Sequence, residues 1–404
     1  MKSLALVLVS LSFLLQAEDD LSTLLLVWQR DPSTTMTLQW IHTDGEARPR
    51  NLHVWADGSD EPTTLNVPPI PLNAWRGHHL HRIEVTNLHP DTLYRFRVHD
   101  HDRVFSFRTL PDTLKRPIRI AIGGDMLHRR EWMDAVNRQV ARHDIDFLII
   151  GGDFAYADAR EERLDRWDDW FASLHETLLL PGDRILPIVA AIGNHEVQRG
   201  YFHHHDDFED SDAWRLRVAP YFYQLFAFPS HPGYDVLDVG DYLSLILLDS
   251  DHTQPVAGAQ TEWLAETLTA RAAGRRHLVP VYHIPAWPSH RPFGLGTSAA
   301  IREHWVPLFE QHGVQVAFEH HDHTYKRTHP LRANAIHPER GITYVGDGAW
   351  GVGTRPVHDP EETWYLKRAE SVHHFILMTL TPEGPLTFQA IRETGEVVDR
   401  WQID

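Results

Sequence analysis

Five different short polar blocks occur along this sequence. In four of them one polar residue stands one to three positions after an apolar run typical of a β-strand; these residues are Asp125, Asp153, Asn194 and His283. In chain order the blocks are Asp125, GGDFAY from residue 151, GNHE from residue 193, His283 and HHDHTYKR from residue 320. In open α/β folds, ligands bind beyond the carboxyl ends of the strands. The chain is therefore expected to fold so that these blocks meet beyond the ends of its strands.

Together the blocks supply carboxylates, imidazoles, an amide oxygen and a phenol. This mixed set can hold two hard or borderline cations side by side. His321 and His323 favour that interpretation, because side chains two residues apart on an extended segment face the same way. The chain has no cysteine, which excludes thiolate nucleophiles, zinc fingers, iron–sulfur clusters and disulfides. The pattern predicts a two-metal centre built from oxygen and imidazole ligands.

The first part of the chain, from about residue 21 to residue 110, reads as short strands separated by Pro, Asp, Gly and Asn, with no helical period. This pattern predicts an all-β sandwich, which we place at residues 18–111. Its closing phrases, HPDTLYRFRV and FSFRTLP, resemble the end of a fibronectin type III domain, with Tyr94 in the place of the corner tyrosine.

After Pro111 the pattern changes to alternating strands and helices. Apolar strand-like runs alternate with amphipathic segments such as residues 131–143 and 260–274. This alternation predicts an α/β domain, residues 112–404, with a β-sheet core flanked by helices.

The first 17 residues read as a secretory signal peptide, with one Lys and an apolar run from Leu4 to Leu15. They predict export, to a secreted or periplasmic location, and a retained membrane anchor stays open as the alternative. No later segment approaches the roughly 20 apolar residues that a membrane helix needs, so no transmembrane segment is expected in the mature chain.

The charge of the chain argues against a polyanionic partner. Its 38 basic and 56 acidic residues give a formal charge of -18, which disfavours nonspecific binding to nucleic acid or to an anionic membrane. The 30 histidines make this charge strongly dependent on pH between 7 and 6.

From about residue 20 to its end the chain resembles the purple acid phosphatases in their two-domain form, a fibronectin-like sandwich followed by a calcineurin-like metallophosphoesterase domain. The resemblance implies a dinuclear centre of Fe(III) and a divalent ion, Zn, Mn or Fe. Carried over by position, the ferric ligands are Asp125, Tyr156 and His323, the bridging ligand is Asp153, and the divalent ligands are Asn194, His283 and His321. It also implies that His195 and His290 contact the phosphate or protonate the leaving group.

The implied activity is hydrolysis of small phosphate monoesters by a metal-bound hydroxide, with an optimum below neutral pH. Two alternatives stay open. A phosphodiesterase or nucleotide-cleaving metallophosphoesterase would use the same ions, and a surface-binding protein would carry a degenerate enzyme domain.

Several positions depart from the family pattern, although none of them removes a ligand. Leu127 and His320 stand where glycine is usual, Lys326 replaces a glutamate, and Pro280 replaces a valine. We interpret His128 as a helix-start residue and the HHHDD run at residues 203–207 as a solvated loop. Trp350 has two open interpretations, a wall of the cleft or part of the core.

Overall fold

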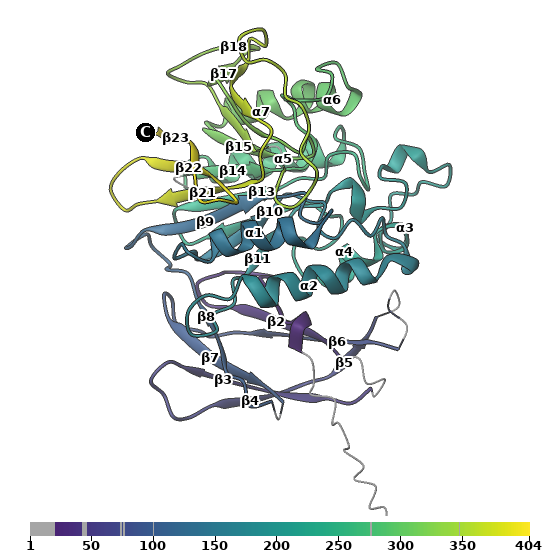
Figure 1. The fold of residues 1–404 in the computed structure, drawn as a ribbon, viewed down its shortest axis with the longest axis vertical. Coiled ribbons are helices and arrows are strands. Elements are labelled where there is room, and N and C mark those ends of the chain that lie inside the picture. The colour runs from purple at the N-terminus through teal and green to yellow at the C-terminus, as the bar shows by residue number, and fades with distance from the viewer. Residues whose placement is uncertain are drawn as a thin grey trace, which may run out of the picture.

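The computed structural model describes residues 21–42, 47–72, 75, 77–99, 101–274, 277–346 and 348–404, and Figure 1 shows a strand-rich unit stacked beneath a larger one. The signal peptide expected at residues 1–17 lies outside the described residues. Among the helices of the described ranges, none is both long and apolar enough to cross a membrane.

The N-terminal unit is a β-sandwich, as the sequence predicted. A short 3-10 turn, η1 (Leu21–Thr23), leads into it. In the part of this unit that the structure describes, two four-stranded antiparallel sheets face each other. One contains β1 (Leu25–Val27), β2 (Met36–His42), β6 (His79–Val85) and β5 (Pro69–Pro71), and the other contains β4 (Thr63–Val67), β3 (Arg50–Ala56), β7 (Leu93–Val98) and β8 (Phe105–Arg108).

Tyr94 makes a contact that fits its interpretation as a corner tyrosine. Its hydroxyl accepts a hydrogen bond from the backbone N–H of His89 at 2.9 Å. In immunoglobulin-like sandwiches the corner tyrosine bonds to the backbone a few residues upstream. The fibronectin type III assignment and the boundary at residue 111 stay predictions.

The second unit contains two sheets that pack face to face. As far as the structure describes them, one has six strands and the other seven. The six-stranded sheet has the order β11 (Ile188–Ala190), β10 (Phe147–Ile150), β9 (Ile118–Gly123), β21 (His374–Leu380), β22 (Leu386–Arg392) and β23 (Val397–Ile403). The seven-stranded sheet has the order β12 (Asp235–Val239), β13 (Leu243–Leu247), β14 (His277–Val281), β15 (Val316–Glu319), β19 (Thr343–Gly346), β16 (Tyr325–Thr328) and β20 (Leu366–Glu370), and β17 (Leu331–Arg332) pairs with β18 (Ala335–Ile336) beside it.

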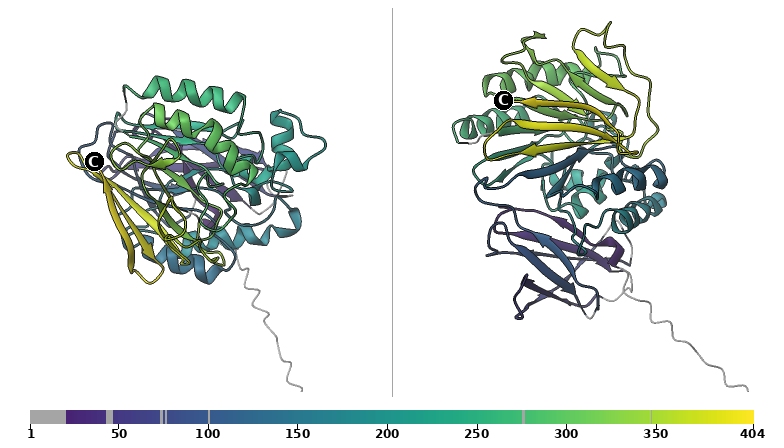
Figure 2. Two further views of the ribbon diagram at one scale, coloured as in Figure 1. Left: turned by 90° about the horizontal axis from the view of Figure 1, so that it is seen from above. Right: turned by 60° about the vertical axis from the view of Figure 1, so that its left-hand side comes forward.

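Helices cover the outer face of each sheet, which confirms the predicted β-sheet core flanked by helices (Figure 2). The helices α1 (Arg130–Val140) and α2 (Asp165–Thr177) pack on the six-stranded sheet, and α3 (Asp212–Val218) and α4 (Pro220–Leu225) extend this layer. The seven-stranded sheet is covered by α5 (Ala259–Arg271), α6 (Gly296–His304) and α7 (Val306–Gln311). Short 3-10 turns occur at η2 (Glu161–Arg163), η3 (Asn194–Glu196) and η4 (Phe202–His204).

The two-residue period of the strands creates these layers. In β9, Ile120 and Ile122 lie in the core between the sheets, whereas Ala121 packs beneath the helices of its own sheet. In β13, Leu245 lies between the sheets and Ile246 faces the helices on the other side. Strands covered on both faces are apolar at nearly every position, which is why they read as almost continuous apolar runs.

The central strands of both sheets run parallel, and this fixes where the polar blocks meet. β9, β10 and β11 pair in parallel in one sheet, as do β13, β14, β15 and β19 in the other. Their carboxyl ends therefore lie at a common edge of each sheet.

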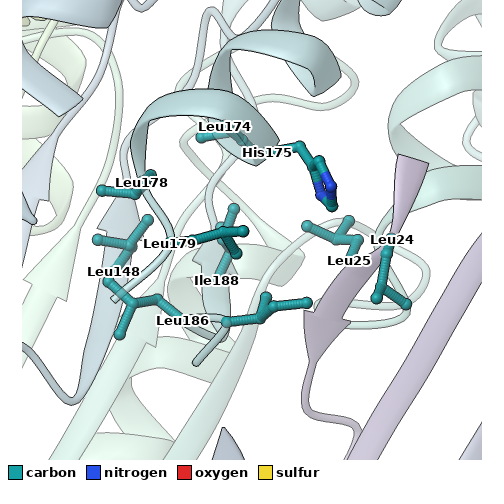
Figure 3. A pocket seen from close by; sticks show the side chains of 10 residues that line it. Leu24, Leu25, Leu148, Leu174, His175, Leu178, Leu179, Leu186 and Ile188 are labelled. Carbon is teal, nitrogen blue, oxygen red and sulfur yellow. The ribbon is translucent and has the colours of Figure 1, made fainter. Parts of the chain in front are cut away.

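Part of the junction between the two units is apolar. Figure 3 shows a small pocket there, in which Leu24 and Leu25 of the sandwich approach Leu174 and Leu178 around the end of α2 and Ile188 of β11. None of the described residues that line this pocket belongs to the five polar blocks. We therefore interpret the junction as structural packing.

Candidate metal centre

The structure brings the seven candidate ligands together at the carboxyl ends of strands from both sheets. Asp125 follows β9, Asp153 and Tyr156 follow β10, Asn194 follows β11, His283 follows β14, and His321 and His323 follow β15. Their donor atoms form two neighbouring groups. A hydrogen bond of 3.0 Å from the backbone N–H of His321 to Asp125 Oδ2 connects the groups.

The first group is a nearly equilateral triangle of donor atoms. Tyr156 Oη lies 3.0 Å from Asp125 Oδ1 and 3.1 Å from His323 Nε2, and the last two atoms are 3.0 Å apart. Donors that bind one cation at about 2.0–2.2 Å with bonds near right angles are about 3 Å apart. The three side chains are therefore spaced as ligands of a single ion.

The second group is centred on His283 Nε2. This atom lies 3.2 Å from Asp153 Oδ2, 3.2 Å from Asn194 Oδ1 and 3.1 Å from His321 Nδ1. Donor atoms of Asp153, His283 and His321 all lie within 4.8 Å of one another, and all three residues are buried. This group offers a second cation two oxygens and two imidazole nitrogens.

The two carboxylate oxygens of Asp153 have different partners. The backbone N–H of His195 donates to Oδ1 at 2.8 Å, whereas Oδ2 is buried and lies 3.2 Å from His283 Nε2. A buried carboxylate needs a positive charge beside it. A cation at this position would supply that charge.

The histidine ligands are oriented by backbone carbonyls behind them. Nδ1–H of His283 donates to the carbonyl of Gly151 at 2.8 Å, and Nδ1–H of His323 donates to that of Gly353 at 3.2 Å. Each bond leaves Nε2 facing the centre. Such contacts fix the tautomer and ring orientation of metal-binding histidines.

The ligand loops are held in an uncommon backbone conformation. Five candidate ligands have positive φ, between 55° and 80°: Asp125, Asp153, Tyr156, His321 and His323. Residues other than glycine rarely adopt this region, and it costs of order 1–3 kcal/mol at each position. Strain of this kind clusters at functional sites, where surrounding contacts hold it in place.

His320 fills the space that two glycines leave open. A Cβ on Gly124 or Gly151 would collide with the His320 ring, so this side chain requires glycine at both positions. Nδ1–H of His320 donates to the carbonyl of Tyr282 at 3.0 Å. The exchange of glycine for His320 therefore adds a buried ring behind the ligand loops and leaves the ligands in place.

The charges at the centre depend on each other. Burial acts to raise the pKa of Asp153, but His283 and His195 hold it well below its usual value. Burial opposes protonation of His283, yet Asp153 and Asp125 raise its pKa to about 9. Burial, followed by Asp125, raises the pKa of Tyr156 well above its usual value. Without a metal, the protein thus balances its buried carboxylates with the positive charge of a protonated imidazole. A bound cation would replace that positive charge.

His195 lies beside the centre, and its role toward a substrate stays a prediction. Its ring centroid is 4.1 Å from that of Tyr156, and its Nε2 is 3.9 Å from Asp153 Oδ2. Its Nδ1 is bonded at 2.5 Å to Asp158, which is also paired with Arg163. Asp158 was not predicted from the sequence, because it lies two residues after Tyr156 and carries no motif of its own.

His290 is not joined to any candidate ligand by a hydrogen bond or ring contact in the described residues. Its Nδ1–H donates to the carbonyl of Pro356 at 2.7 Å. Its neighbour Arg291 donates through Nη1 to the backbone carbonyl of His321 at 2.7 Å. The role expected for His290 stays a prediction.

Glu196 is a second residue whose role was not predicted from the sequence. Its carboxylate accepts the backbone N–H groups of Asp153 at 2.7 Å, Phe154 at 2.9 Å and Gly193 at 2.9 Å. It therefore ties the GGDFAY and GNHE loops together. Its position beside His195 in the GNHE block was the only available signal.

The structure also places His128, Trp350 and the HHHDD loop. His128 packs on Tyr156 and accepts the N–H of Gly353 at 3.1 Å, and burial together with His323 lowers its pKa to about 4. Trp350 is fully buried and donates to Asn137 at 2.8 Å, so it belongs to the core. His203, in the HHHDD loop, stacks on Tyr201 with a centroid distance of 5.4 Å.

Comparison with known proteins agrees with this geometry. Residues 22–109 match the family described as purple acid phosphatase, N-terminal domain, and residues 118–325 match the calcineurin-like phosphoesterases. The chain is 30% identical over 275 residues to purple acid phosphatase 21 of Arabidopsis thaliana, covering 67% of this chain and 58% of that protein. It is 27% identical over 349 residues to an uncharacterized Mycobacterium tuberculosis protein, covering 75% and 61%.

Among solved structures, purple acid phosphatase from yellow lupin (Lupinus luteus) seeds matches with a TM-score of 0.73 and 17% identity, covering 95% of this chain and 74% of that chain. At this identity the match shows a shared fold. The chain spans about three fifths of the length of the curated relatives described above.

Proposed function

The chain belongs to the purple acid phosphatase family, and from this premise we propose that it hydrolyses phosphate monoesters at a two-metal centre formed by the seven candidate ligands. The observation that carries the proposal is the pair of adjacent donor groups, one around Tyr156 Oη and one around His283 Nε2, each with separations of 3.0–3.2 Å.

The donor sets fit two different ions. Asp125, Tyr156 and His323 combine a carboxylate, a phenol and one imidazole, which suits the hard Fe(III) ion. Asn194, His283 and His321 provide an amide oxygen and two imidazoles, which suits a borderline divalent ion, Zn, Mn or Fe. Asp153, whose Oδ2 lies 3.2 Å from His283 Nε2, would hold the divalent ion and, as the family resemblance implies, share its carboxylate with the ferric ion.

When bound, such a pair of cations supplies Lewis-acid chemistry, because it lowers the pKa of a water and offsets charge on the phosphoryl oxygens. The chain's own contribution is orientation and proton transfer. Asp158 holds Nδ1 of His195, so that Nε2 faces the centre. A proton on Nε2 can pass to a phosphoryl oxygen or to the departing alkoxide.

The test compares para-nitrophenyl phosphate with bis-para-nitrophenyl phosphate between pH 4 and pH 9, on protein reconstituted with iron and a divalent metal. We expect the monoester to be cleaved faster, with an optimum below pH 7. Asn194→Ala should lose most of this activity, and Asn66→Ala, on an exposed strand of the sandwich, serves as the matched control. Faster cleavage of the diester would replace the proposal with a phosphodiesterase, and no cleavage of either ester would reject both.

A further inference from the structure

Two exposed histidines of the HHHDD loop lie as close together as two candidate ligands of the metal centre. The ring centroids of His203 and His204 are 4.6 Å apart, with an angle of 75° between the rings. The corresponding values for His283 and His321 are 4.8 Å and 64°. Two imidazoles that bind one ion at about 2.0–2.1 Å, with bonds about 90–110° apart, have centroids about 4.5–5.2 Å apart. His203 and His204 are therefore spaced to hold one ion together.

The backbone orients one ring of this pair. Nδ1–H of His204 donates to the carbonyl of Arg199 at 2.9 Å, so in the neutral ring Nε2 is the nitrogen that can bind an ion. A backbone carbonyl behind Nδ1 also orients His283 in the centre. The side chain of His203 forms no hydrogen bond with the described residues, and both rings of the pair are exposed. An ion in solution can therefore reach them directly.

The loop around the pair is acidic. Residues 203–212 contain five carboxylates and no Lys or Arg. Three of these carboxylates are paired with arginines of α3. Asp206 and Glu209 are exposed, and neither forms an ion pair with a described residue. Because negative charge raises the local concentration of cations, the loop is suited to attract the ions that the two imidazoles bind.

A series of ring contacts leads from the pair to the metal centre. Tyr201 lies against both exposed rings, with centroid distances of 5.4 Å to His203 and 5.2 Å to His204. The Tyr201 ring is also 5.5 Å from that of His252, and the His252 ring is 5.5 Å from that of His283. Only two rings thus separate the exposed pair from a candidate ligand of the divalent ion.

The candidate ligands are less accessible than this pair. Asp153, His283 and His321 are buried, so an ion that reaches them has to exchange its water shell for protein donors. Removing a cation from water is costly unless new ligands replace the water. Two exposed imidazoles replace part of the shell and leave the other positions of a four-coordinate ion to water. They hold the ion less firmly than the four donor atoms of the second group, so the ion can move on.

We propose that His203 and His204 form an exposed site for a borderline divalent ion such as Zn²⁺, from which the ion passes to the divalent position of the centre. Imidazole ligands suit ions of this class. The inference rests on the proposed function for the divalent position alone, and it concerns how the centre is loaded.

The first test measures zinc content by elemental analysis after equilibrium dialysis of the metal-loaded protein against low micromolar Zn²⁺. We expect the wild type to hold about one ion per chain more than His203→Gln or His204→Gln, because the site needs both imidazoles. His89→Gln, at an exposed histidine of the sandwich, should keep the wild-type content. Equal zinc content in the wild type and both loop variants, or an equal loss in His89→Gln, would overturn the site.

The second test measures how fast the divalent position fills. Protein freed of metal by a chelator is mixed with Zn²⁺, samples are quenched with excess chelator, which removes exposed ions first, and the retained zinc is measured against time. Uptake should be about tenfold slower in His203→Gln and His204→Gln, as expected for loss of a local supply of cations, with the same final content. His89→Gln should match the wild type, and equal rates in all four proteins would overturn the passage of the ion.

Neither readout depends on hydrolysis, so this inference and the proposed function can fail separately. If the wild type does not cleave para-nitrophenyl phosphate, the proposed function fails, whereas zinc content and uptake rate still decide the inference. If the wild type cleaves the ester but all four proteins have the same zinc content and uptake rate, the inference fails alone.

Discussion

The carboxylate of Glu196 accepts a hydrogen bond from the backbone N–H of Asp153 at 2.7 Å. Glu196 is buried and is not one of the candidate ligands, yet it fixes the loop that carries the proposed bridging ligand. Two more N–H groups, of Phe154 and Gly193, point at the same carboxylate. The strained φ of 57° at Asp153 is thus held from behind by three hydrogen bonds.

Glu196→Gln should weaken the centre without removing a ligand. The amide nitrogen of glutamine cannot accept an N–H, so at least one buried backbone donor loses its partner, at a cost of about 1–3 kcal/mol. Metal affinity should fall about 10- to 100-fold, as it does when contacts behind metal ligands are lost. Metal content after dialysis and the melting temperature measure the two effects. Glu209→Gln, at an exposed position, should change neither.

Asp158→Asn should slow catalysis more than it weakens binding. Asp158 Oδ1 lies 2.5 Å from Nδ1 of His195 and so selects one ring tautomer. An asparagine can turn either its amide oxygen or its amide nitrogen toward Nδ1. The proton could then be on either ring nitrogen, and Nε2 would no longer be protonated in every molecule. We expect kcat for para-nitrophenyl phosphate to fall about 100-fold, the lower range for loss of a positioned acid, with little change in KM. Asp169→Asn on the exposed face of α2 is the control, and a change confined to KM would contradict the assigned role.

Removing the metals should destabilise the fold as well as abolish activity. Binding to the folded state alone stabilises a protein by mass action, and here the ligand loops carry residues with strained backbone angles and the buried carboxylates of Asp125 and Asp153. A chelator should therefore lower the melting temperature by several degrees. Tyr156→Phe should retain about one metal per chain fewer than Tyr234→Phe, as measured by elemental analysis. Equal metal content in the two variants would place the phenol outside the ligand set.

Removing one partner of the buried Lys326–Glu319 pair should lower the free energy of unfolding more than replacing both partners. Lys326 stands where the family has glutamate, and its ammonium donates to Glu319 Oε2 and to the carbonyl of Trp287. Glu319 Oε1 also accepts Tyr282 Oη at 2.6 Å and the N–H of Ala286 at 2.8 Å. Lys326→Met leaves a buried carboxylate unpaired, which costs about 3–5 kcal/mol.

The double variant Lys326→Met with Glu319→Gln should recover part of that loss, because glutamine can still accept one of the remaining donors. Chemical denaturation of both single variants and the double variant gives the coupling energy. Additive losses would show that the pair does not interact. Lys367→Met, at an exposed position of β20, controls for the removal of a lysine.

Sequence patterns predicted the parts of this protein that depend on local order. Asp125, Asp153 and Asn194 follow apolar runs, and parallel pairing of those runs brings their side chains together. Sequence order could not show that β21 inserts beside β9, because residues 374–380 pair with residues 118–122, which lie far away in the sequence. The prediction of a sheet core was therefore right in kind, and its division into two facing sheets came from long-range pairing.

The same limit applies to residues that act on the ligands from behind. Glu196 belongs to the GNHE block and Asp158 follows the GGDFAY block, but neither block indicates what these two residues do. Their roles follow from contacts with Asp153 and His195 that the fold creates. The positive φ of Tyr156 was equally hidden, because loop composition predicts such angles for glycine and asparagine first.

The N-terminal sandwich contains a buried histidine that should make stability depend on pH. His81 is fully buried and stacks on Trp40 with a centroid distance of 5.1 Å and an interplanar angle of 9°. Burial lowers its pKa from 6.5 to about 4, the Val67 carbonyl opposes this shift, and His42 and Arg50 add to it. In the unfolded chain His81 takes up a proton near pH 6.5, whereas in the folded chain it stays neutral until about pH 4.

The contribution of neutral His81 to the free energy of unfolding is therefore fully present above pH 6.5. It is lost as the pH falls toward 4, by up to about 1.4 kcal/mol per pH unit. His81→Phe keeps the aromatic stack and removes the titration, so its free energy of unfolding should fall less steeply between pH 6.5 and pH 4 than that of the wild type. His89→Phe, at an exposed position, should keep the wild-type slope. Urea denaturation at half-unit pH steps measures the slope of the free energy of unfolding against pH for all three proteins. Equal slopes for His81→Phe and wild type would show that other groups cause the loss of stability in acid, because the two proteins differ in this range only in the titration of His81.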